Sequence, residues 1–341
     1  MVSKAMLHSL LQKQLSYSPE PGPLHTFRDA TWRPSSTPVL PDPIAPAVAP
    51  LNSLHLLTWN IDFMASRPRE RMASALRYLE QLVADIPSSS AVVIFLQEIM
   101  ESENVGEQDA NDLSQIANAP WIQQKFNVTD IGSGEWDSPY GQVALVDRRL
   151  AVARVSRLRF VSEYQRVALF VDVCLCSSSS GDAKYLRLCN VHLDSSYGTM
   201  RPVQWKALAK HLQSGAEGVA ASILAGDCNA NQPRDRTEPQ DNGFKDAYLE
   251  LGRGEGDEEG ATWGFQSLSW ERWGRQRLDK EVFWGDVRVR KLDRMGVGVQ
   301  VEDEAARSEI KSLGELPFVT DHYGLMGDFE VQDGLRTVTS D

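Results

Sequence analysis

Polar side chains follow several apolar stretches of this sequence, at the points where β-strands are expected to end. These clusters of carboxylates, amides and imidazoles fall at residues 60–62, 97–98, 192–195, 227–229, 277–280 and 320–324. An Asp or Asn after a strand is usually a turn residue or a helix cap, and a lone His is usually structural. Six such clusters at strand ends instead predict one polar cleft, because a rigid scaffold can present several strand ends to the same place.

The oxygen-bearing members of these clusters suit a hard cation. They are Asn60, Asp62, Glu98, Asp227, Asn229 and Asp321. Mg²⁺ prefers oxygen ligands and keeps several waters, whereas zinc sites use more His or Cys. His192 and His322 can donate to phosphate oxygens or act as acids. A metal, a carboxylate that positions water and histidine donors are together what hydrolysis of a phosphoester requires.

The strands that carry these clusters are predicted from the apolar pattern. Residues 53–60 alternate as a half-buried strand does, and residues 91–97 form an apolar run typical of a strand buried on both faces. Further strands are expected at 141–146, 151–160, 165–176, 184–194, 220–226, 279–285 and 317–331.

Two helices are also predicted. Pro68 stands where a helix begins, and Met72, Leu76, Leu79, Val83 and Ile86 then recur on one helical face. A second helix is expected over residues 202–213. Many strands, short turns and few helices predict an α+β fold, in which two mixed β-sheets pack face to face with helices outside, a four-layer α/β/β/α sandwich.

Composition narrows the function classes. The chain has 341 residues and a formal net charge of −12, which argues against a protein that coats nucleic acid through bulk positive charge but not against a local basic groove. Its apolar runs are far shorter than the roughly 20 residues of a membrane span, so no membrane partner is expected. The four cysteines form no CxxC pair, which indicates free thiols.

The first 50 residues differ in texture from the rest. Prolines cluster from Pro19 to Pro50, and proline lacks a backbone donor. We expect residues 1–50 to be a largely extended leader that forms no sheet, with a short helix near 3–15, and residues 51–341 to be one catalytic domain. The glycine-rich acidic stretch 252–261 is expected to be a solvated surface insertion.

The ordered set of motifs resembles the endonuclease/exonuclease/phosphatase superfamily, which has the DNase I-like fold. The resemblance covers about residues 51–333. Within it, the chain is similar to the tyrosyl-DNA phosphodiesterase 2 subfamily. The motifs that carry the resemblance are Thr58-Trp59-Asn60-Ile61-Asp62, Leu96-Gln97-Glu98, His192-Leu193-Asp194-Ser195, Gly226-Asp227-Cys228-Asn229, Thr262-Trp263, Arg277-Leu278-Asp279-Lys280 and Asp321-His322-Tyr323-Gly324-Leu325.

The resemblance implies a metal-side role for some of these residues. Glu98 would bind Mg²⁺, or Mn²⁺ in its place, directly. Asn60 and Asp62 would complete the surroundings of the metal and phosphate. Asp321 would lie in the outer shell of the metal.

The resemblance also implies the residues that act on water and phosphate. Asp227 would orient or deprotonate the attacking water, and Asn229 would hold that water or a phosphate oxygen. His322 would stabilise the pentacovalent phosphate, with Asp279 orienting its ring. His192 and Ser195 would contact the phosphate from the other side.

Three further residues are candidates for substrate contacts. Trp263 and Arg277 resemble nucleic-acid contacts of the family, since an aromatic ring stacks on any base and Arg pairs with phosphate. The alternative for Trp263 is a core tryptophan. Tyr140 could donate to the scissile phosphate or simply pack at the rim.

The implied activity is hydrolysis of 5′-tyrosyl-DNA phosphodiester bonds in DNA repair, by a nuclear monomer acting on DNA 5′ ends that carry a tyrosyl or peptide adduct. Asp194 and Thr320 depart from the subfamily pattern, where Glu and Ser are usual. Alternatives are an abasic endonuclease, a deadenylase or a lipid phosphatase of the same fold. A non-catalytic binding module is a further alternative, although such decay usually removes residues equivalent to Glu98, Asp227 or His322.

Overall fold

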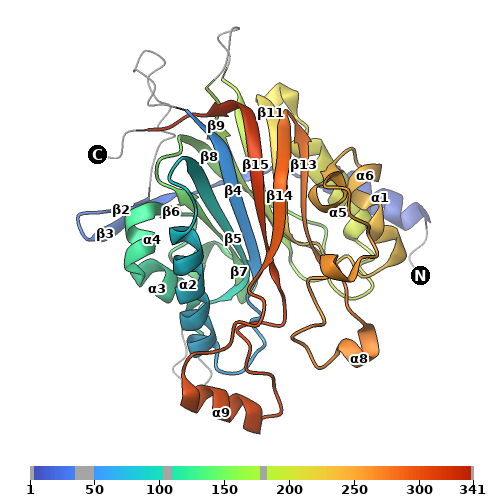
Figure 1. The fold of residues 1–341 in the computed structure, drawn as a ribbon. Helices are drawn as coiled ribbons and strands as arrows, with labels where there is room; N and C mark the ends of the chain where they lie inside the picture. Colours follow the sequence, from blue (N-terminus) through green and yellow to red (C-terminus); the bar gives the residue numbers. More distant parts are fainter. Residues whose placement is uncertain (1–3, 35–49, 103–109, 177–182, 339–341) are drawn as a thin grey trace.

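Two β-sheets packed face to face form the centre of the protein (Figure 1). The computed structural model describes residues 4–34, 50–102, 110–176 and 183–338, and all structural statements concern these residues. The seven-stranded sheet has the order β1-β8-β9-β10-β11-β13-β12. Its strands are β1 (Glu20–Gly22), β8 (Val152–Arg159), β9 (Val167–Cys174), β10 (Tyr185–His192), β11 (Val219–Asp227), β12 (Lys245–Asp246) and β13 (Asp279–Gly285).

The eight-stranded sheet has the order β14-β15-β4-β5-β7-β6-β2-β3. Its strands are β2 (His25–Arg28), β3 (Thr31–Pro34), β4 (Leu51–Asn60), β5 (Ser90–Met100), β6 (Phe126–Val128), β7 (Tyr140–Asp147), β14 (Val287–Met295) and β15 (Gly324–Leu335). Both sheets are mixed: β4 pairs with β5 and β10 with β11 in parallel, while neighbours such as β5 and β7 are antiparallel. Parallel pairs end at the same edge, which brings the ends of β4 and β5 together, and likewise those of β10 and β11.

Helices cover the outer faces of both sheets (Figure 1). The helices are α1 (Lys4–Leu15), α2 (Pro68–Ala84), α3 (Asp112–Asn118), α4 (Pro120–Lys125), α5 (Arg201–Leu212), α6 (Glu238–Asp241), α7 (Ala247–Glu250), α8 (Trp270–Trp273) and α9 (Glu304–Ser312). This is the predicted four-layer α/β/β/α sandwich. None of the helices in the described part of the chain has the length and apolar character that a membrane span requires.

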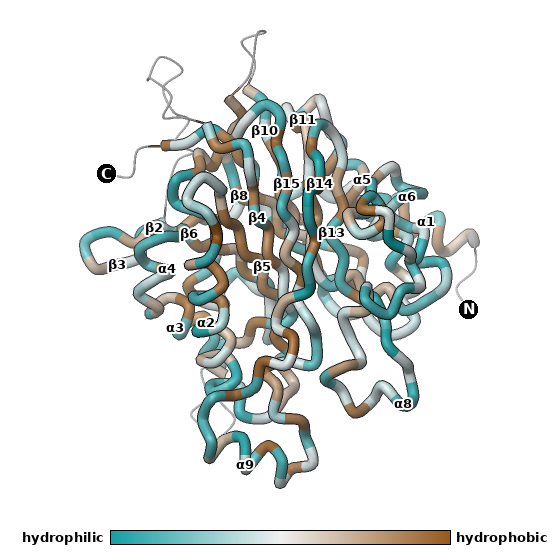
Figure 2. Tube along the Cα trace, viewed as in Figure 1, coloured by the Kyte–Doolittle hydropathy of each residue, from teal (hydrophilic) through white to brown (hydrophobic). Residues whose placement is uncertain are grey.

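Successive side chains of each strand point to opposite faces of its sheet, and this divides the apolar core into layers. Leu56 of β4 packs with Val171 and Ile223 between the sheets, whereas the neighbouring Leu57 packs under α2 with Leu76. A third cluster holds α5 against the seven-stranded sheet. Apolar residues accordingly gather along the central strands in Figure 2. This packing is what makes the strand ends a rigid platform.

The helix and most strands predicted around the site are confirmed. Helix α2 begins at Pro68 as expected and buries Met72, Leu76, Leu79 and Val83. The predicted strand over 317–331 is wrong in its first part, because β15 begins only at Gly324 and the preceding residues form a loop. Strand β14 was not predicted, because a bulge between Val289 and Lys291 interrupts its alternation of buried and exposed residues.

The expectation that the leader forms no sheet is wrong for residues 20–34. Strand β1 pairs with β8, and β2 and β3 form a hairpin whose first strand joins β6. These strands are short, and the two that contain proline, β1 and β3, are edge strands, where proline is tolerated. The predicted helix is present as α1, and the buried Gln14 ties it to the backbone of Arg159 and Val161. The remaining leader residues 35–49 lie outside the described residues.

Candidate active site

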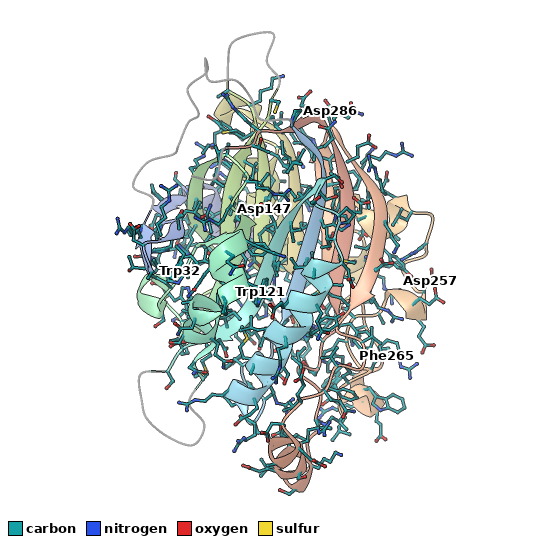
Figure 3. The ribbon with its side chains drawn as sticks, turned by 60° about the vertical axis from the view of Figure 1, so that its left-hand side comes forward. Trp32, Trp121, Asp147, Asp257, Phe265 and Asp286 are labelled. Atoms are coloured by element: carbon teal, nitrogen blue, oxygen red, sulfur yellow. The ribbon has the colours of Figure 1, made fainter. Side chains whose placement is uncertain are left out.

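The predicted polar residues meet at one end of the sandwich, where both sheets present strand ends. Asn60 ends β4, His192 ends β10 and Asp227 ends β11, while the antiparallel β13 begins there at Asp279. Figure 3 shows the loops around Phe265 at this end and Asp286, which follows β13, at the opposite end. The site is therefore an interface between the two sheets.

The Asn60 side chain joins the two sheets at the centre of the site. Its Nδ2 donates to Glu98 Oε1 and to Asp227 Oδ2, each at 3.1 Å. His192 Nε2 lies 3.5 Å from Glu98 Oε1 and 3.4 Å from Asp227 Oδ2. Two carboxylates and an imidazole thus face one small volume.

Several site residues have a left-handed backbone that non-glycine residues rarely adopt. Asp62, Glu98 and Asn229 have φ of 60°, 59° and 47°. Glu98 lies where the register between β5 and β7 shifts, and such a bulge turns a side chain away from the regular alternation. Strained conformations of this kind concentrate at functional sites because packing elsewhere compensates for them.

Gly226 lets β11 approach β10 closely just before Asp227. Its φ is +147°, and a Cβ there would lie 2.0 Å from the Val191 carbonyl oxygen. We expect Gly226→Ala to lower the free energy of unfolding by about 3 kcal/mol or more, as combined strain and overlap do. Urea unfolding checks this, with Gly256→Ala as control, since nothing lies within 4 Å of that position. Equal stability of the two variants would contradict the expectation.

His322 is held by three different segments. Its backbone N–H donates to the Thr320 hydroxyl, which itself donates to the Asn60 carbonyl, and its carbonyl accepts from the Trp59 indole. Its Nδ1 is 2.8 Å from Asp279 Oδ2, which is the contact expected of an orienting carboxylate. Burial alone would lower the pKa of His322, but Asp279, Asp321 and Asp227 together raise it well above its usual value. The ring is therefore cationic at neutral pH, with Nε2 free to face the site.

His192 has the opposite protonation state. Its Nδ1 is 2.9 Å from an Arg166 nitrogen, and burial together with this positive charge lowers the pKa of His192 to about 3. Arg can only donate, so Nδ1 accepts and the single proton of the neutral ring is on Nε2. His192 therefore points an N–H toward Glu98 and Asp227, as a donor to a bound oxyanion would.

The site fits a hard divalent cation better than zinc. Glu98, His192 and Asp227 offer atoms within 4.8 Å of one another. The proton on His192 Nε2 leaves the carboxylate oxygens as the available ligands, and oxygen ligands suit Mg²⁺. Burial raises the pKa of Glu98, and the charge of Asp227 raises it further. A cation between these carboxylates would remove that cost, so the predicted ligand Glu98 fits Mg²⁺ with Asp227 beside it.

Asn229 supports Asp227 from the following loop. Its backbone N–H donates to Asp227 Oδ1 at 2.7 Å, and its Nδ2 donates to the Leu193 carbonyl at 3.0 Å. Its own side-chain oxygen is left for water or phosphate. Asn229 thus lies where the sequence analysis expected it.

A buried amide pair under the site was missed by sequence reasoning. Gln97 Nε2 donates to Asn190 Oδ1 at 2.7 Å, and Asn190 Nδ2 donates to the carbonyls of Leu96 and Val143. Both side chains are fully buried. These bonds join β5 of one sheet to β10 of the other, and they fix the separation of Glu98 and His192.

Asp62 and Asp321 lie side by side on one flank of the centre. Asp62 accepts from the Met64 N–H, and its own N–H donates to Asn60. Burial, then Asp321 and Glu98, raise the pKa of Asp62 to about 7. Asp321 accepts from the Trp263 indole at 2.6 Å, so Trp263 is a half-buried wall of the site rather than a core residue.

Tyr140 lies on the other flank with Arg166, which the sequence analysis missed. The Tyr140 ring stacks on Phe63 with 4.0 Å between centroids, and the Arg166 guanidinium lies 5.2 Å from the ring centroid. Arg166 is buried and its Nε has no partner among the described residues. Ser195 is half-buried in the loop after β10. Arg166 follows no recognisable motif, and only its position before an apolar strand could have indicated it.

The charge of Arg277, the predicted nucleic-acid contact, is satisfied within the protein, although the residue lines a cavity beside α8. Its guanidinium is buried, pairs with both oxygens of Asp246 and also pairs with Glu255. The buried Lys280 shares Glu255 at 3.1 Å. Because these carboxylates satisfy the charge of Arg277, it holds β12 to the loop before β13. The acidic stretch 252–261 is correspondingly more than a solvated insertion, since its Glu255 covers these buried cations.

Comparison with known proteins gives the same fold. The D. rerio TDP2 structure complexed with single-strand DNA product aligns with a TM-score of 0.59 and 17% identity, covering 82% of this chain and 100% of that one. Truncated Caenorhabditis elegans TDP2 aligns at 0.58 with 20% identity, covering 82% and 98%. The human Nocturnin catalytic domain with bound sulfate aligns at 0.53 with 16% identity, covering 83% and 96%. No curated protein matches the sequence.

Members of the endonuclease/exonuclease/phosphatase family hydrolyse phosphodiester bonds and typically depend on a divalent metal. The model of that family matches residues 57–322, a span that runs from β4 to His322 and so contains every strand end that builds the site. The chain belongs to the endonuclease/exonuclease/phosphatase family.

Proposed function

We propose that this protein is a Mg²⁺-dependent phosphodiesterase that releases tyrosine, or a peptide carrying it, from the 5′ end of DNA. The observation that carries the proposal is the convergence of Asn60, Glu98 and Asp227 with two histidines in opposite protonation states. A phosphate in this volume would meet an N–H from His192 and a cation from His322. Both stabilise the negative charge that builds on phosphate oxygens during attack.

The residues divide the chemistry between them. Asp227 and Asn229 hold the attacking water at the end of the seven-stranded sheet, and Asp227 accepts its proton. Mg²⁺ bound at Glu98 would supply positive charge to the phosphate and to the leaving oxygen. His322, His192 and Asn60 hold the phosphate between them. The product is a DNA 5′-phosphate and a free tyrosine hydroxyl.

The flank formed by Phe63, Tyr140 and Arg166 supports an aromatic leaving group. A tyrosine leaves as a phenolate with a pKa near ~10, so it needs less acid assistance than an alkoxide. The unpartnered Arg166 Nε and the stacked rings offer a cation and aromatic faces on this side. The cation favours a ring that gains negative charge, and the aromatic faces can stack on that ring.

The surface around α8 supports binding of single-stranded DNA. Trp270, Arg272, Trp273 and Arg275 form a tryptophan–arginine face around α8, with Trp270 and Trp273 exposed by 46% and 57%. The Arg272 guanidinium lies 4.6 Å from the Trp273 ring. These residues, apart from Arg272, line a cavity of about 780 Å³ that also reaches the loop after Asn229. Arg275 pairs with Glu258 in its wall, so Arg272 and the two tryptophans are the groups left to meet a strand. Exposed aromatics among arginines bind single strands by stacking and phosphate pairing, and the D. rerio TDP2 neighbour was solved with such a strand.

The test is release of tyrosine from a 5′-tyrosyl single-stranded oligonucleotide with Mg²⁺. We expect a 5′-phosphate product from the wild-type protein and at least about a 10³-fold slower reaction from Asp227→Asn, which loses the water-positioning carboxylate. Gel mobility before and after phosphatase treatment identifies the product end.

A substrate panel separates this activity from others on the same fold. An abasic-site duplex, a polyadenylate and a phosphoinositide are assayed under the same conditions. Cleavage of any of these substrates, with no release of tyrosine from the 5′-tyrosyl oligonucleotide, would contradict the proposal. We also propose that the protein acts in the nucleus and as a monomer. Imaging of the tagged protein checks its location, and light scattering checks its oligomeric state.

A further inference from the structure

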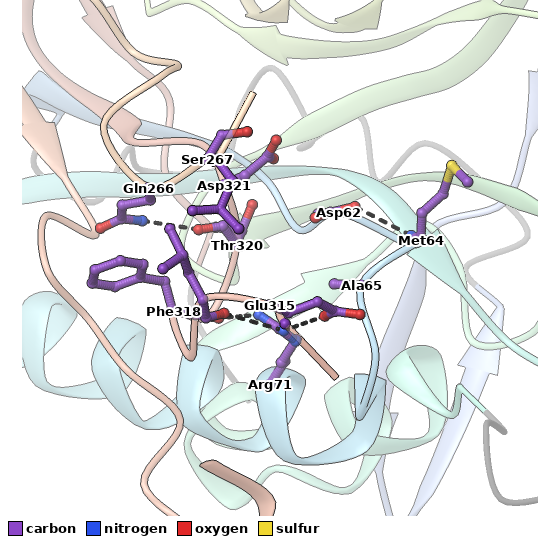
Figure 4. Close-up of a pocket in the computed structure, with 13 residues that line it drawn as sticks. Asp62, Met64, Ala65, Arg71, Gln266, Ser267, Glu315, Phe318, Thr320 and Asp321 are labelled. Carbon is purple, nitrogen blue, oxygen red and sulfur yellow. Dashed lines mark hydrogen bonds and ion pairs between the residues drawn. The ribbon is translucent and has the colours of Figure 1, made fainter. Parts of the chain in front are cut away.

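A pocket adjoins the catalytic centre on the side of the eight-stranded sheet (Figure 4). It has a volume of about 240 Å³ and lies between the loop that follows β4, residues 266–268 and residues 314–321. We call it the side pocket. Asp62 and Asp321 line it and also flank the catalytic centre, since Asp321 Oδ1 lies 3.8 Å from His322 Nε2. The two spaces therefore share a wall.

The charge of the side pocket is unsuited to DNA. Its single lining cation, among the described residues, is Arg71, which is buried. Arg71 donates to Glu315 at 3.0 Å and to the Phe318 carbonyl (Figure 4). It also donates to the Ser66 carbonyl. With that charge satisfied, Asp321 leaves the wall acidic. Such a wall repels phosphate and attracts an ammonium or guanidinium group.

The mouth of the side pocket is apolar. Met64 is 80% exposed and Leu268 is 60% exposed, and both belong to the lining. Exposed apolar side chains beside a concave acidic wall are typical of a surface that binds the stem and the charged head of a long basic side chain.

The direction of the reaction assigns the side pocket to the leaving group. The attacking and leaving oxygens lie roughly in line with phosphorus. The water is held by Asp227 and Asn229 at the end of the seven-stranded sheet, so the leaving oxygen departs toward the loops of the eight-stranded sheet. Those loops include the loop after β4, in which Phe63 stacks on Tyr140 while Met64 and Ala65 line the side pocket. A tyrosine ring that leaves beside Phe63 therefore has the side pocket next to it, where the attached peptide can lie.

We propose that the side pocket binds the peptide attached to the adduct tyrosine and favours a Lys or Arg within two residues of it. This inference rests on the proposed function and names the protein half of its substrate. The water oxygen bonds to phosphorus, the bond from phosphorus to the tyrosine oxygen breaks, and the phenolate takes a proton from solvent. The peptide itself is unchanged and leaves through the side pocket.

The test uses one oligonucleotide with three 5′ adducts: tyrosine alone, a pentapeptide with Lys on both sides of the tyrosine, and the same pentapeptide with Glu. We expect kcat/KM for the Lys peptide to exceed that for the Glu peptide about fivefold, as one or two partly exposed ion pairs allow. Leu268→Lys and Met64→Lys, two independent rim variants, each place a cation at the mouth and should bring this ratio near one.

The matched control is Ile131→Lys, which adds the same charge at a position that is 38% exposed and does not line the side pocket. It should keep the wild-type ratio. Failure to cleave the tyrosine-only adduct would overturn the proposed function. Cleavage of that adduct with equal kcat/KM for both peptides would overturn the side-pocket assignment alone. The assignment would also be overturned if the rim variants kept the wild-type ratio of kcat/KM for the two peptides but bound the unmodified oligonucleotide more tightly. DNA would then occupy the pocket.

Discussion

Replacing His322 with glutamine is expected to lower kcat for a 5′-tyrosyl oligonucleotide by about 10³-fold, the loss typical when a donor to a developing oxyanion is removed. Glutamine keeps a polar side chain of similar length but has no charge. His322 is held by Thr320, Trp59 and Asp279, so its Nε2 has one direction in which to act. Circular dichroism should show an unchanged fold, and an active His322→Gln enzyme would remove this residue from the mechanism.

The pH dependence tests the same residue without removing it. Although burial lowers the pKa of His322, Asp279 and then Asp321 and Asp227 raise it well above the usual value. The rate should therefore fall on the alkaline side, as pH rises through this raised pKa and the ring loses its charge. Asp279→Asn keeps the shape of the orienting side chain but removes its charge, so the alkaline limb should move to lower pH.

The contribution of the Asp279–His322 pair to the stability of the folded protein should also decrease as pH rises. A raised histidine pKa stabilises the folded state fully below the pKa of the unfolded chain, and this contribution is lost as pH rises through the folded pKa. Asp279→Asn should lose stability in the range where the wild-type pair is charged. Asp286→Asn, at the exposed opposite end of β13, is the matched control. Identical alkaline limbs for wild type and Asp279→Asn would show that Asp279 does not set the charge of His322.

Replacing Glu98 with glutamine is expected to raise the Mg²⁺ concentration for half-maximal activity by about 10²-fold, since even outer-shell changes at metal sites cost 10–100-fold. The physical reason is that the half-buried Glu98 and the buried Asp227 form a carboxylate pair, in which burial and then Asp227 raise the pKa of Glu98. Glutamine removes one of these charges. The measurement is the initial rate as a function of Mg²⁺, repeated with Mn²⁺.

A second readout of Glu98→Gln does not depend on activity. A carboxylate whose pKa is raised in the folded state destabilises that state at neutral pH, so the metal-free variant should melt at or above the wild-type Tm. Added Mg²⁺ should raise the Tm of the wild-type protein, because it binds only the folded state, and should raise that of Glu98→Gln much less. Glu80→Gln, an exposed change on α2 with the same charge difference, should behave as wild type. Equal Mg²⁺ responses of wild type and Glu98→Gln would exclude Glu98 as a ligand.

Much of the site can be predicted from sequence because its residues follow local patterns. Asn60, His192 and Asp227 each come at the end of an apolar strand, and a strand end is set by a few neighbouring residues. The apolar face of α2 is likewise a local periodicity. Spacing alone therefore predicts a four-layer sandwich with a polar edge, and the family follows from the order of the motifs.

Residues whose role depends on distant partners cannot be predicted this way. Arg277 looks like a phosphate contact in its motif, yet its charge is satisfied by Asp246, 31 residues away. Arg166 has no motif, and it acquires its importance from His192 and Tyr140. The leader strands depend on β6 and β8, which offer edges that no reading of residues 20–34 contains.

The sequence by itself determined which chemical groups this protein brings to its reaction: carboxylates, amides and two histidines at the ends of apolar strands. Only the tertiary structure decided the state of those groups. His192 and His322 share one residue type and one ordinary pKa. Burial, together with Arg166, makes the first neutral, whereas Asp279 outweighs burial and makes the second cationic. Electrostatic energy depends on distance and burial rather than on separation along the chain, so this difference exists only once the two sheets have packed together.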